Sequence, residues 1–288
     1  MENNEGKVKS RKPHLVVWVV LFIVFIIVAA TCIGVWVYHA VLRRAMSELY
    51  GDARETIVAL PNAGNDIDGS SENGGVNALP DDEGKGTDGS ELYPLAKIDF
   101  GLLKQTSPDV YAWIEIPGTP VAFPIVQHPK NNDYYLRRAI NGAYDITGCI
   151  YTQNYNSKDF SDRNTLIYGH YMDDGTKFGP LLSYMDEEFF NTHRRIDIYT
   201  ETEWFTYEVF AAIPFNTRHI LQSYKGVDDA HAAFLNDVFS STDARSIIAE
   251  YIDIDPENDR MITLSTCLKT DTRRYLVLAK LVKSQLCE

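Results

Sequence analysis

An apolar run at residues 15–38 constrains this chain more than any other feature, because it holds no charge and no proline over 24 positions. As an α-helix the run would be about 36 Å long, which exceeds the roughly 30 Å hydrocarbon core of a bilayer. A cleaved signal peptide is the alternative, but its apolar part would be about 7 to 15 residues long and would end in a small-residue cleavage site. Trp36 and Tyr38 are typical of the aromatic belt at a membrane interface. We therefore expect residues 15–38 to be an uncleaved transmembrane helix.

The charges that flank this run predict its orientation. Four basic residues precede it, namely Lys7, Lys9, Arg11 and Lys12. Only Arg43 and Arg44 follow it closely. Because the cytoplasmic flank of a membrane helix carries the excess of Lys and Arg, we expect residues 1–14 in the cytoplasm. The chain is then a single-pass protein of the cell membrane, and its remaining residues are extracellular.

Composition divides the rest of the chain into three segments. Residues 39–60 have apolar side chains at roughly helical spacing and are expected to continue as a juxtamembrane helix. Residues 61–92 contain seven glycines, many Asp, Asn and Ser, and no aromatic residue. Such a segment cannot bury enough apolar surface to offset its ordering entropy, so it predicts a flexible acidic stalk. Aromatic residues return at Tyr93, and we expect one compact domain over residues 93–284.

The distribution of charge argues against nucleic acid as a partner. The chain has a formal charge of −13 at pH 7, but residues 1–50 contribute +3, which leaves −16 for residues 51–288. A domain this acidic is not suited to bind phosphate backbones or anionic lipid through a basic patch. We expect no nucleic-acid partner, and contact with the membrane through the N-terminal helix.

The chain has four cysteines, of which two can belong to the compact domain. Cys32 is inside the apolar run and Cys287 is next to the C-terminus, which leaves Cys149 and Cys267. Two cysteines are too few for a disulfide framework, and no CxxC spacing indicates a zinc site. A single Cys149–Cys267 disulfide is the alternative to a buried Cys149 and a reactive Cys267.

Eight runs of residues have strand character, and each is bounded by Gly, Pro, Asn or Asp. They cover residues 111–118, 120–127, 148–153, 164–170, 194–200, 203–215, 260–267 and 274–282. Because closure removes exposed strand edges, this number of strands predicts a mostly β domain that forms a closed eight-stranded barrel. Residues 94–108 predict a short helix before the first strand. Residues 228–251 predict one or two helices between the sixth and seventh strands.

Cys267, in the segment TLSTC, is the candidate nucleophile. A thiol attacks as the thiolate, so it needs a histidine to exchange its proton and a cation or amide donors for the oxyanion. His170 is the candidate histidine because it ends a strand-like run directly after a glycine, where the backbone can present a side chain to a cleft. Arg273 and Arg274 are the candidate cations. Successive side chains of a strand point to opposite faces, and we prefer Arg274 because it belongs to the strand itself.

Three segments, NTLIYGHYM, TLSTC and RYLVLAKLV, resemble in this order the signature segments of the sortases, cysteine transpeptidases of Gram-positive bacterial surfaces. The likeness extends over residues 93–284 in strand order. The helix before the first strand and the helical insertion between the sixth and seventh strands resemble the class B subgroup. The resemblance implies a sortase-type barrel behind an N-terminal anchor.

The resemblance also implies an activity that needs neither a metal nor another cofactor. Cys267 would attack the carbonyl of a threonine in the C-terminal sorting signal of an exported protein and form a thioacyl enzyme. His170 would protonate the departing amine and later deprotonate the incoming one, while Arg274 would steady the oxyanion. The incoming amine would belong to a cell-wall precursor or a pilin. Class B sorting signals are often of the Asn-Pro-x-Thr kind.

Four further residues near these segments are weaker candidates. Ser265 and Thr266, directly before the nucleophile, either hydrogen-bond substrate or cap the strand end. Tyr168 shares a strand face with His170 and either lines the groove or packs in the core. Asp271 is a solvated loop carboxylate or the third member of a triad.

Two other functions stay open at this level. A cysteine hydrolase or endopeptidase of the same fold would share the first step, with water taking the acyl group instead of an amine. A non-catalytic surface-binding module would carry a Cys267 that is inert to thiol reagents.

Overall fold

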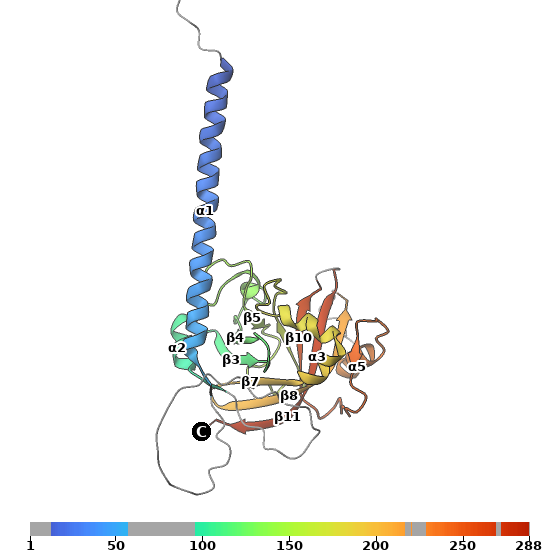
Figure 1. Cartoon of the computed structure of the whole chain (residues 1–288). Helices are drawn as coiled ribbons and strands as arrows, with labels where there is room; N and C mark the ends of the chain where they lie inside the picture. Colours follow the sequence, from blue (N-terminus) through green and yellow to red (C-terminus); the bar gives the residue numbers. More distant parts are fainter. Residues whose placement is uncertain (1–12, 57–95, 217–219, 221–228, 269–271, 288) are drawn as a thin grey trace, which may run out of the picture. The chain divides into compact units, whose positions relative to one another are not determined.

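The computed structural model in Figure 1 describes residues 13–56, 96–216, 220, 229–268 and 272–287. The predicted stalk, residues 61–92, and the loop residue Asp271 lie outside the described residues. The chain divides into two compact units, Met1–Leu49 and Tyr50–Glu288.

The apolar run is part of one continuous helix, α1 (Pro13–Ala53). Among the described residues it is the one helix long and apolar enough to cross a membrane. Large apolar side chains on it, such as Phe22 and Phe25, are exposed, as lipid contact requires. The helix continues past residue 39, but Arg54–Thr56 form a strand, β1, so the predicted juxtamembrane helix ends before residue 60.

The second unit is built on a closed barrel of eight strands (Figure 1). They are β3 (Val110–Glu115), β4 (Ala122–Val126), β5 (Ile150–Thr152), β6 (Asn164–Tyr168), β7 (Arg195–Tyr199), β8 (Glu203–Phe215), β10 (Met261–Cys267) and β11 (Arg274–Leu286). Neighbours follow the order β11-β10-β6-β5-β4-β3-β7-β8, and β11 also pairs with β8, which closes the ring. The eight predicted strands and the closure are confirmed.

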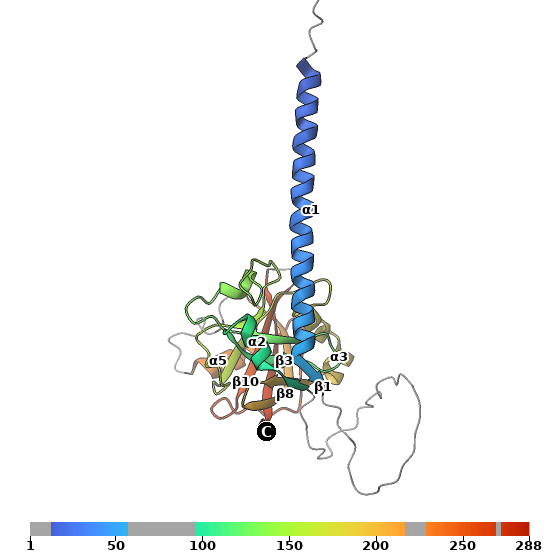
Figure 2. The same ribbon diagram turned by 90° about the vertical axis from the view of Figure 1, so that its left-hand side faces the viewer.

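Short helices pack around the barrel, and an aspartate side chain caps three of them, with Asp186 accepting from Phe189 N at 2.9 Å in one case. The carboxylate of Asp99 accepts a hydrogen bond from Leu102 N at 2.8 Å at the start of α2 (Phe100–Thr106), which Figure 2 shows in front of β3. Asp229 caps α5 (Ala230–Phe239), a helix in the insertion between β8 and β10, by accepting from Ala232 N at 3.0 Å. The remaining short helices are η1 (Tyr134–Arg137), η2 (Gly179–Met185) and α3 (Glu187–Thr192).

Two short strands arise where partners distant in sequence supply hydrogen bonds. Residues Ala96–Ile98, within the segment predicted as a helix, form β2 and pair with β1. In the insertion, α5 is followed by β9 (Ile247–Ile248), which pairs with Ala211 and Ala212 of β8. Local propensity is a weak guide in both places, because what stabilises a short strand is its cross-strand neighbour.

Alternation along β10 and β11 places their apolar side chains in two different clusters. Ile262 and Leu264 of β10 pack with Val277 of β11 in the barrel interior. Met261 of β10 and Leu276 of β11 belong to a second cluster, which lies on the outer face and is covered by α5. Along β10, residues of odd number therefore face outward, and this parity decides which side chains can meet at the strand end.

The residues that follow Leu49 belong to the barrel unit. The ring of Tyr50 contacts the rings of Trp113 and Phe123, with centroids 6.3 and 6.1 Å apart. Within the β1–β2 pair, Thr56 is the partner of Ala96. Thr56 and Ala96 are therefore neighbours within this unit.

An ion pair joins β1 to β3, and we expect it to contribute measurably to the free energy of unfolding. Arg54 Nε donates to Glu115 Oε2 at 3.0 Å, and the Glu115 side chain is 8% exposed. Arg54→Ala leaves this carboxylate buried without its cation, so we expect the free energy of unfolding to fall by about 2 kcal/mol. Thermal and denaturant unfolding of the full chain in detergent measure this loss.

Lys104→Ala is the matched control, because Lys104 pairs with Glu201 where both side chains are more exposed. An exposed pair contributes about 0 to 1 kcal/mol. Equal losses of stability in the two variants would contradict the structural role assigned to Arg54.

Candidate active site

The ends of two parallel strands bring Cys267 and His170 to one edge of the barrel. Cys267 is the last residue of β10 and is exposed. β6 runs parallel to β10 with Tyr168 opposite Ser265, and Gly169 N donates to Ser265 O at 3.1 Å. Although β6 ends at Tyr168, continuing this register by two residues along each segment places His170 opposite Cys267.

β11 brings Arg274 to the same place from the other side of β10. The two strands are antiparallel, and Cys267 is the ladder partner of Arg274. Arg274 Nη1 donates to Cys267 Sγ at 3.4 Å. A guanidinium at this distance stabilises negative charge on the sulfur or on an oxygen beside it.

The adjacent arginine is directed elsewhere. Arg273 Nη1 contacts Asp243 Oδ2 at 3.0 Å, in the loop that follows α5. The same carboxylate accepts from Arg245 Nη2 at 2.8 Å. Hydrogen bonds from Arg245, with a further one from Arg273, hold the pKa of Asp243 well below its usual range. Arg273 is therefore part of an ion-pair cluster, and Arg274 is the arginine next to the sulfur.

The glycine before His170 is required by its packing. A Cβ at Gly169 would lie 2.5 Å from Ile150 Cδ1 and 2.6 Å from Phe178 Cδ2, which leaves no room for a side chain. Phe178 N donates to the His170 carbonyl at 3.0 Å, and His170 Nε2 lies 2.7 Å from the carbonyl oxygen of Leu136. Backbone and ring of His170 are thus both held by neighbours.

Tyr168 of β6 lies on the same face of the strand as His170 and is half-buried. Its ring stacks on Tyr151 of β5, with centroids 5.5 Å apart and an interplanar angle of 26°. Its hydroxyl has no hydrogen-bond partner within the part of the chain that the structure describes. Burial raises the pKa of Tyr168 well above its usual value, while Arg274 opposes this shift. Whether Tyr168 contacts substrate stays a prediction.

Tyr151 of β5 is a further residue beside the candidate site, and we did not predict it from the sequence. It is the ladder partner of Tyr168. Burial raises its pKa to about 12, Asp133 and Cys267 add to the shift, and Arg274 opposes it, so this phenol is close to the charges of the site. The signal that would have identified Tyr151 is the pairing of β5 with β6, which is not visible in the local pattern.

The two residues before the nucleophile differ in orientation. Ser265 shares the outer face with Cys267 but is only 1% exposed. Thr266 has the opposite parity and is completely buried. Strand alternation directs the Thr266 side chain into the barrel, and a role of this residue in binding substrate stays a prediction.

Cys149, directly before β5, and Cys267 are both free thiols, so the Cys149–Cys267 disulfide is not formed. Cys149 is buried, and its Sγ donates to Arg138 O at 3.2 Å. Burial raises the pKa of this thiol to about 11. Cys149 is thus an unreactive buried thiol, whereas Cys267 is accessible. Within the described residues, no group of three or more His, Cys, Asp or Glu side chains could hold a metal ion.

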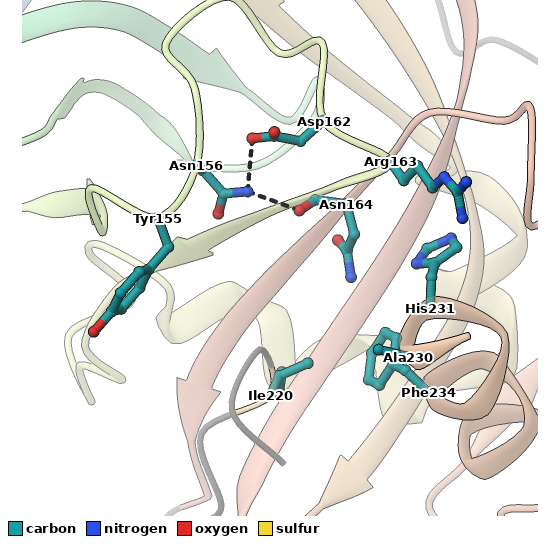
Figure 3. A pocket seen from close by; sticks show the side chains of 9 residues that line it. All are labelled: Tyr155, Asn156, Asp162, Arg163, Asn164, Ile220, Ala230, His231 and Phe234. Carbon is teal, nitrogen blue, oxygen red and sulfur yellow. Dashed lines mark hydrogen bonds between the residues drawn. The ribbon is translucent and has the colours of Figure 1, made fainter. Parts of the chain in front are cut away.

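A separate pocket of about 230 Å³ lies at the other end of β6 (Figure 3). Asn164, the first residue of β6, lines it together with Arg163 and His231. Burial and the nearby Arg163 lower the pKa of His231. Because β6 and β10 are parallel, this pocket and the Cys267 site are at opposite ends of the same strands, and Cys267 does not line it.

Comparison with known proteins agrees with the fold. The family model described as the sortase domain matches residues 114–282, and the chain belongs to the sortase family. Sortase B of Staphylococcus aureus is 28% identical over 189 residues, which cover 64% of this chain and 75% of the relative. Sortase B of Listeria monocytogenes is 30% identical over 165 residues, covering 57% and 65%.

Solved structures show the same relationship. The chain superimposes on Clostridium perfringens sortase B with a TM-score of 0.57 at 29% identity, over 64% of this chain and all of that one. For sortase B of Bacillus anthracis the TM-score is 0.55 at 34% identity, over 64% of this chain and 84% of the other. The protein is accordingly a cysteine transpeptidase of the class B group, and the predicted family, subgroup and enzyme class are confirmed.

Proposed function

We propose that this sortase cleaves the C-terminal sorting signal of exported proteins after a threonine and transfers the acyl group to an amine of the cell wall or of a pilin. The observation that best supports the proposal is the 3.4 Å contact between Arg274 Nη1 and the sulfur of Cys267, at an exposed strand end beside His170. A nucleophile, an anion-stabilising donor and a proton carrier are the groups that acyl transfer requires.

In the proposed first step, the Cys267 thiolate forms a bond to the threonine carbonyl carbon, and the carbonyl electrons move to the oxygen near Arg274. Collapse of this intermediate breaks the C–N bond while His170 donates a proton to the departing amine. In the second step an amine attacks the thioester and His170 accepts its proton. Cys267 then leaves as the thiolate. Because the thioester conserves the energy of the cleaved peptide bond, no nucleotide is consumed.

We propose further that α1 anchors the enzyme with residues 1–14 in the cytoplasm and the barrel outside the cell. The length and apolar surface of α1 support the anchor, and the basic residues before it support this orientation. Exported substrates and wall precursors would then reach Cys267 on the outer side of the membrane.

Two kinds of acceptor amine fit the proposal, and the similar proteins do not distinguish between them. A class B sortase of Streptococcus pyogenes, with a TM-score of 0.54 at 28% identity, is described as involved in pilus biogenesis. For this chain, a cell-wall peptide and a pilin lysine are both primary amines that could resolve the same thioester.

The response to an added amine tests the proposal. We expect the purified full chain in detergent to cleave peptides of the Asn-Pro-x-Thr kind and, with triglycine present, to yield the peptide–triglycine conjugate as the main product. An amine that attacks the thioester forms a new amide bond to the acyl group, whereas water releases the acyl group as a free carboxylic acid. Mass spectrometry of the products separates conjugate from free acid. Cleavage that yields the free acid alone and does not respond to triglycine would identify a hydrolase instead.

A further inference from the structure

We propose that the backbone carbonyl of Leu136 positions His170, and that Gly148 and Cys149 hold this carbonyl in place. The Leu136 carbonyl makes Nε2 of His170 the nitrogen that always carries a proton, so Nδ1 is the nitrogen that gains and loses one. The inference deepens the proposed function and rests on it, since His170 is the proton carrier there.

The hydrogen bond itself determines the tautomer. His170 Nε2 lies 2.7 Å from Leu136 O. A carbonyl oxygen can only accept a hydrogen bond, so Nε2 must be the donor in both the neutral and the charged ring. The partner of one ring nitrogen thereby determines which nitrogen exchanges protons.

The neighbouring carbonyls show how the loop around η1 is attached. Tyr135 O accepts from Cys149 N at 3.0 Å, and Arg138 O accepts from Cys149 Sγ at 3.2 Å. Arg137 O accepts from Asp145 N at 3.1 Å. The carbonyls on both sides of Leu136 are thus bound to residues 145–149, and the Leu136 carbonyl between them is directed to the His170 ring.

Gly148 is in direct contact with this arrangement. Its φ of +57° is in the left-handed region, and a Cβ on it would lie 2.5 Å from Leu136 O and 2.7 Å from Tyr135 O. Only glycine fits there, because any side chain would displace the carbonyl that orients the imidazole. A single methyl group at position 148 therefore acts directly on the Leu136 carbonyl, and also on the neighbouring Tyr135 carbonyl.

The experiment compares Gly148→Ala with Gly175→Ala in the full chain. Gly175 has a similar φ of +76° but nothing within 4 Å of an added Cβ, so it carries the same backbone strain without touching a carbonyl. Ring ¹⁵N spectra of labelled histidine, with His170 assigned from a His170→Gln sample, report the tautomer. Cleavage of the same peptides gives kcat and KM.

In the unmodified chain and in Gly175→Ala we expect His170 as the Nε2–H tautomer. In Gly148→Ala we expect a mixture of tautomers and a kcat about 10- to 100-fold lower, the scale for loss of a group that orients a functional side chain, with KM nearly unchanged. An Nδ1–H tautomer in the unmodified chain, or an intact Nε2–H tautomer in Gly148→Ala, would overturn the proposal. The spectra do not depend on turnover, so failure of the proposed function would be seen separately as an expected tautomer without peptide cleavage.

Cys149 provides a second pair of variants in case Gly148→Ala does not fold. Cys149→Ala removes the donor to Arg138 O, while Cys149→Ser retains a donor at that position. We expect partial tautomer mixing and a severalfold lower kcat in the alanine variant, and recovery of both in the serine variant. Identical spectra for the two variants would contradict the role of Cys149 in holding the loop.

Discussion

Replacing Cys267 by alanine is expected to abolish cleavage of sorting-signal peptides and formation of the thioacyl enzyme. Cys267 Sγ is exposed at the end of β10 and contacts Arg274, and the proposed thioester forms on this sulfur. Loss of the nucleophile in a protease costs on the order of 10⁶-fold in kcat, which is below detection here. Peptide cleavage followed by chromatography, together with intact-mass measurement of the acyl enzyme, tests this expectation.

Cys287→Ala is the matched control, because Cys287 is also an exposed free thiol but lies near the C-terminal end of the chain. We expect this variant to keep full activity and to react with a thiol reagent at Cys267. Peptide capture undiminished in Cys267→Ala, combined with a Cys267 that resists the reagent in Cys287→Ala, would favour a binding module over the proposed chemistry.

Arg274→Ala is expected to lower kcat about 100- to 1000-fold, the usual effect of losing one oxyanion donor. The guanidinium is the ladder neighbour of Cys267 and is 3.4 Å from its sulfur, so its removal leaves the developing anion without this donor. Since the stabilised charge develops in the transition state, the loss should be in kcat more than in KM. Steady-state kinetics on the peptides that the unmodified enzyme cleaves give both constants.

Arg273→Ala is the matched control for this variant. Arg273 is the preceding residue and has the same charge, but its guanidinium pairs with Asp243. The pair is partly exposed, so its loss costs about 1 kcal/mol of stability or less, and activity should stay close to that of the unmodified chain. If Arg273→Ala were the inactive variant and Arg274→Ala the active one, the assignment of the cation would be reversed.

Local patterns in the sequence were sufficient for most of the architecture. The eight strands of the barrel have their alternating or apolar runs bounded by turn residues, and each was identified within a few residues of its observed ends. The apolar run inside α1 is longer than the hydrocarbon core of a bilayer is thick, which no soluble helix of a small domain requires. The segments around His170, Cys267 and Arg274 carried the family resemblance, since the residue types that perform acyl transfer are few.

Pairings between distant strands decided the rest. Whether Thr266 faces a groove or the core depends on the parity of β10 within the barrel, and the TLSTC segment is compatible with either. β1 and β2 become strands because each is the other's partner. Tyr151 reaches the site through its pairing with Tyr168, and Leu136 reaches His170 across 34 positions of sequence.

The physical reason for this division is the range of the interactions involved. Side-chain periodicity and turn chemistry act over a few residues, so they can be read along the chain. Register, closure and the partner of each polar group are set by contacts between segments far apart in sequence, whose energies compete only once the barrel is assembled. For this protein, the residue types needed for the chemistry could be read from the sequence, whereas their mutual geometry required the folded barrel.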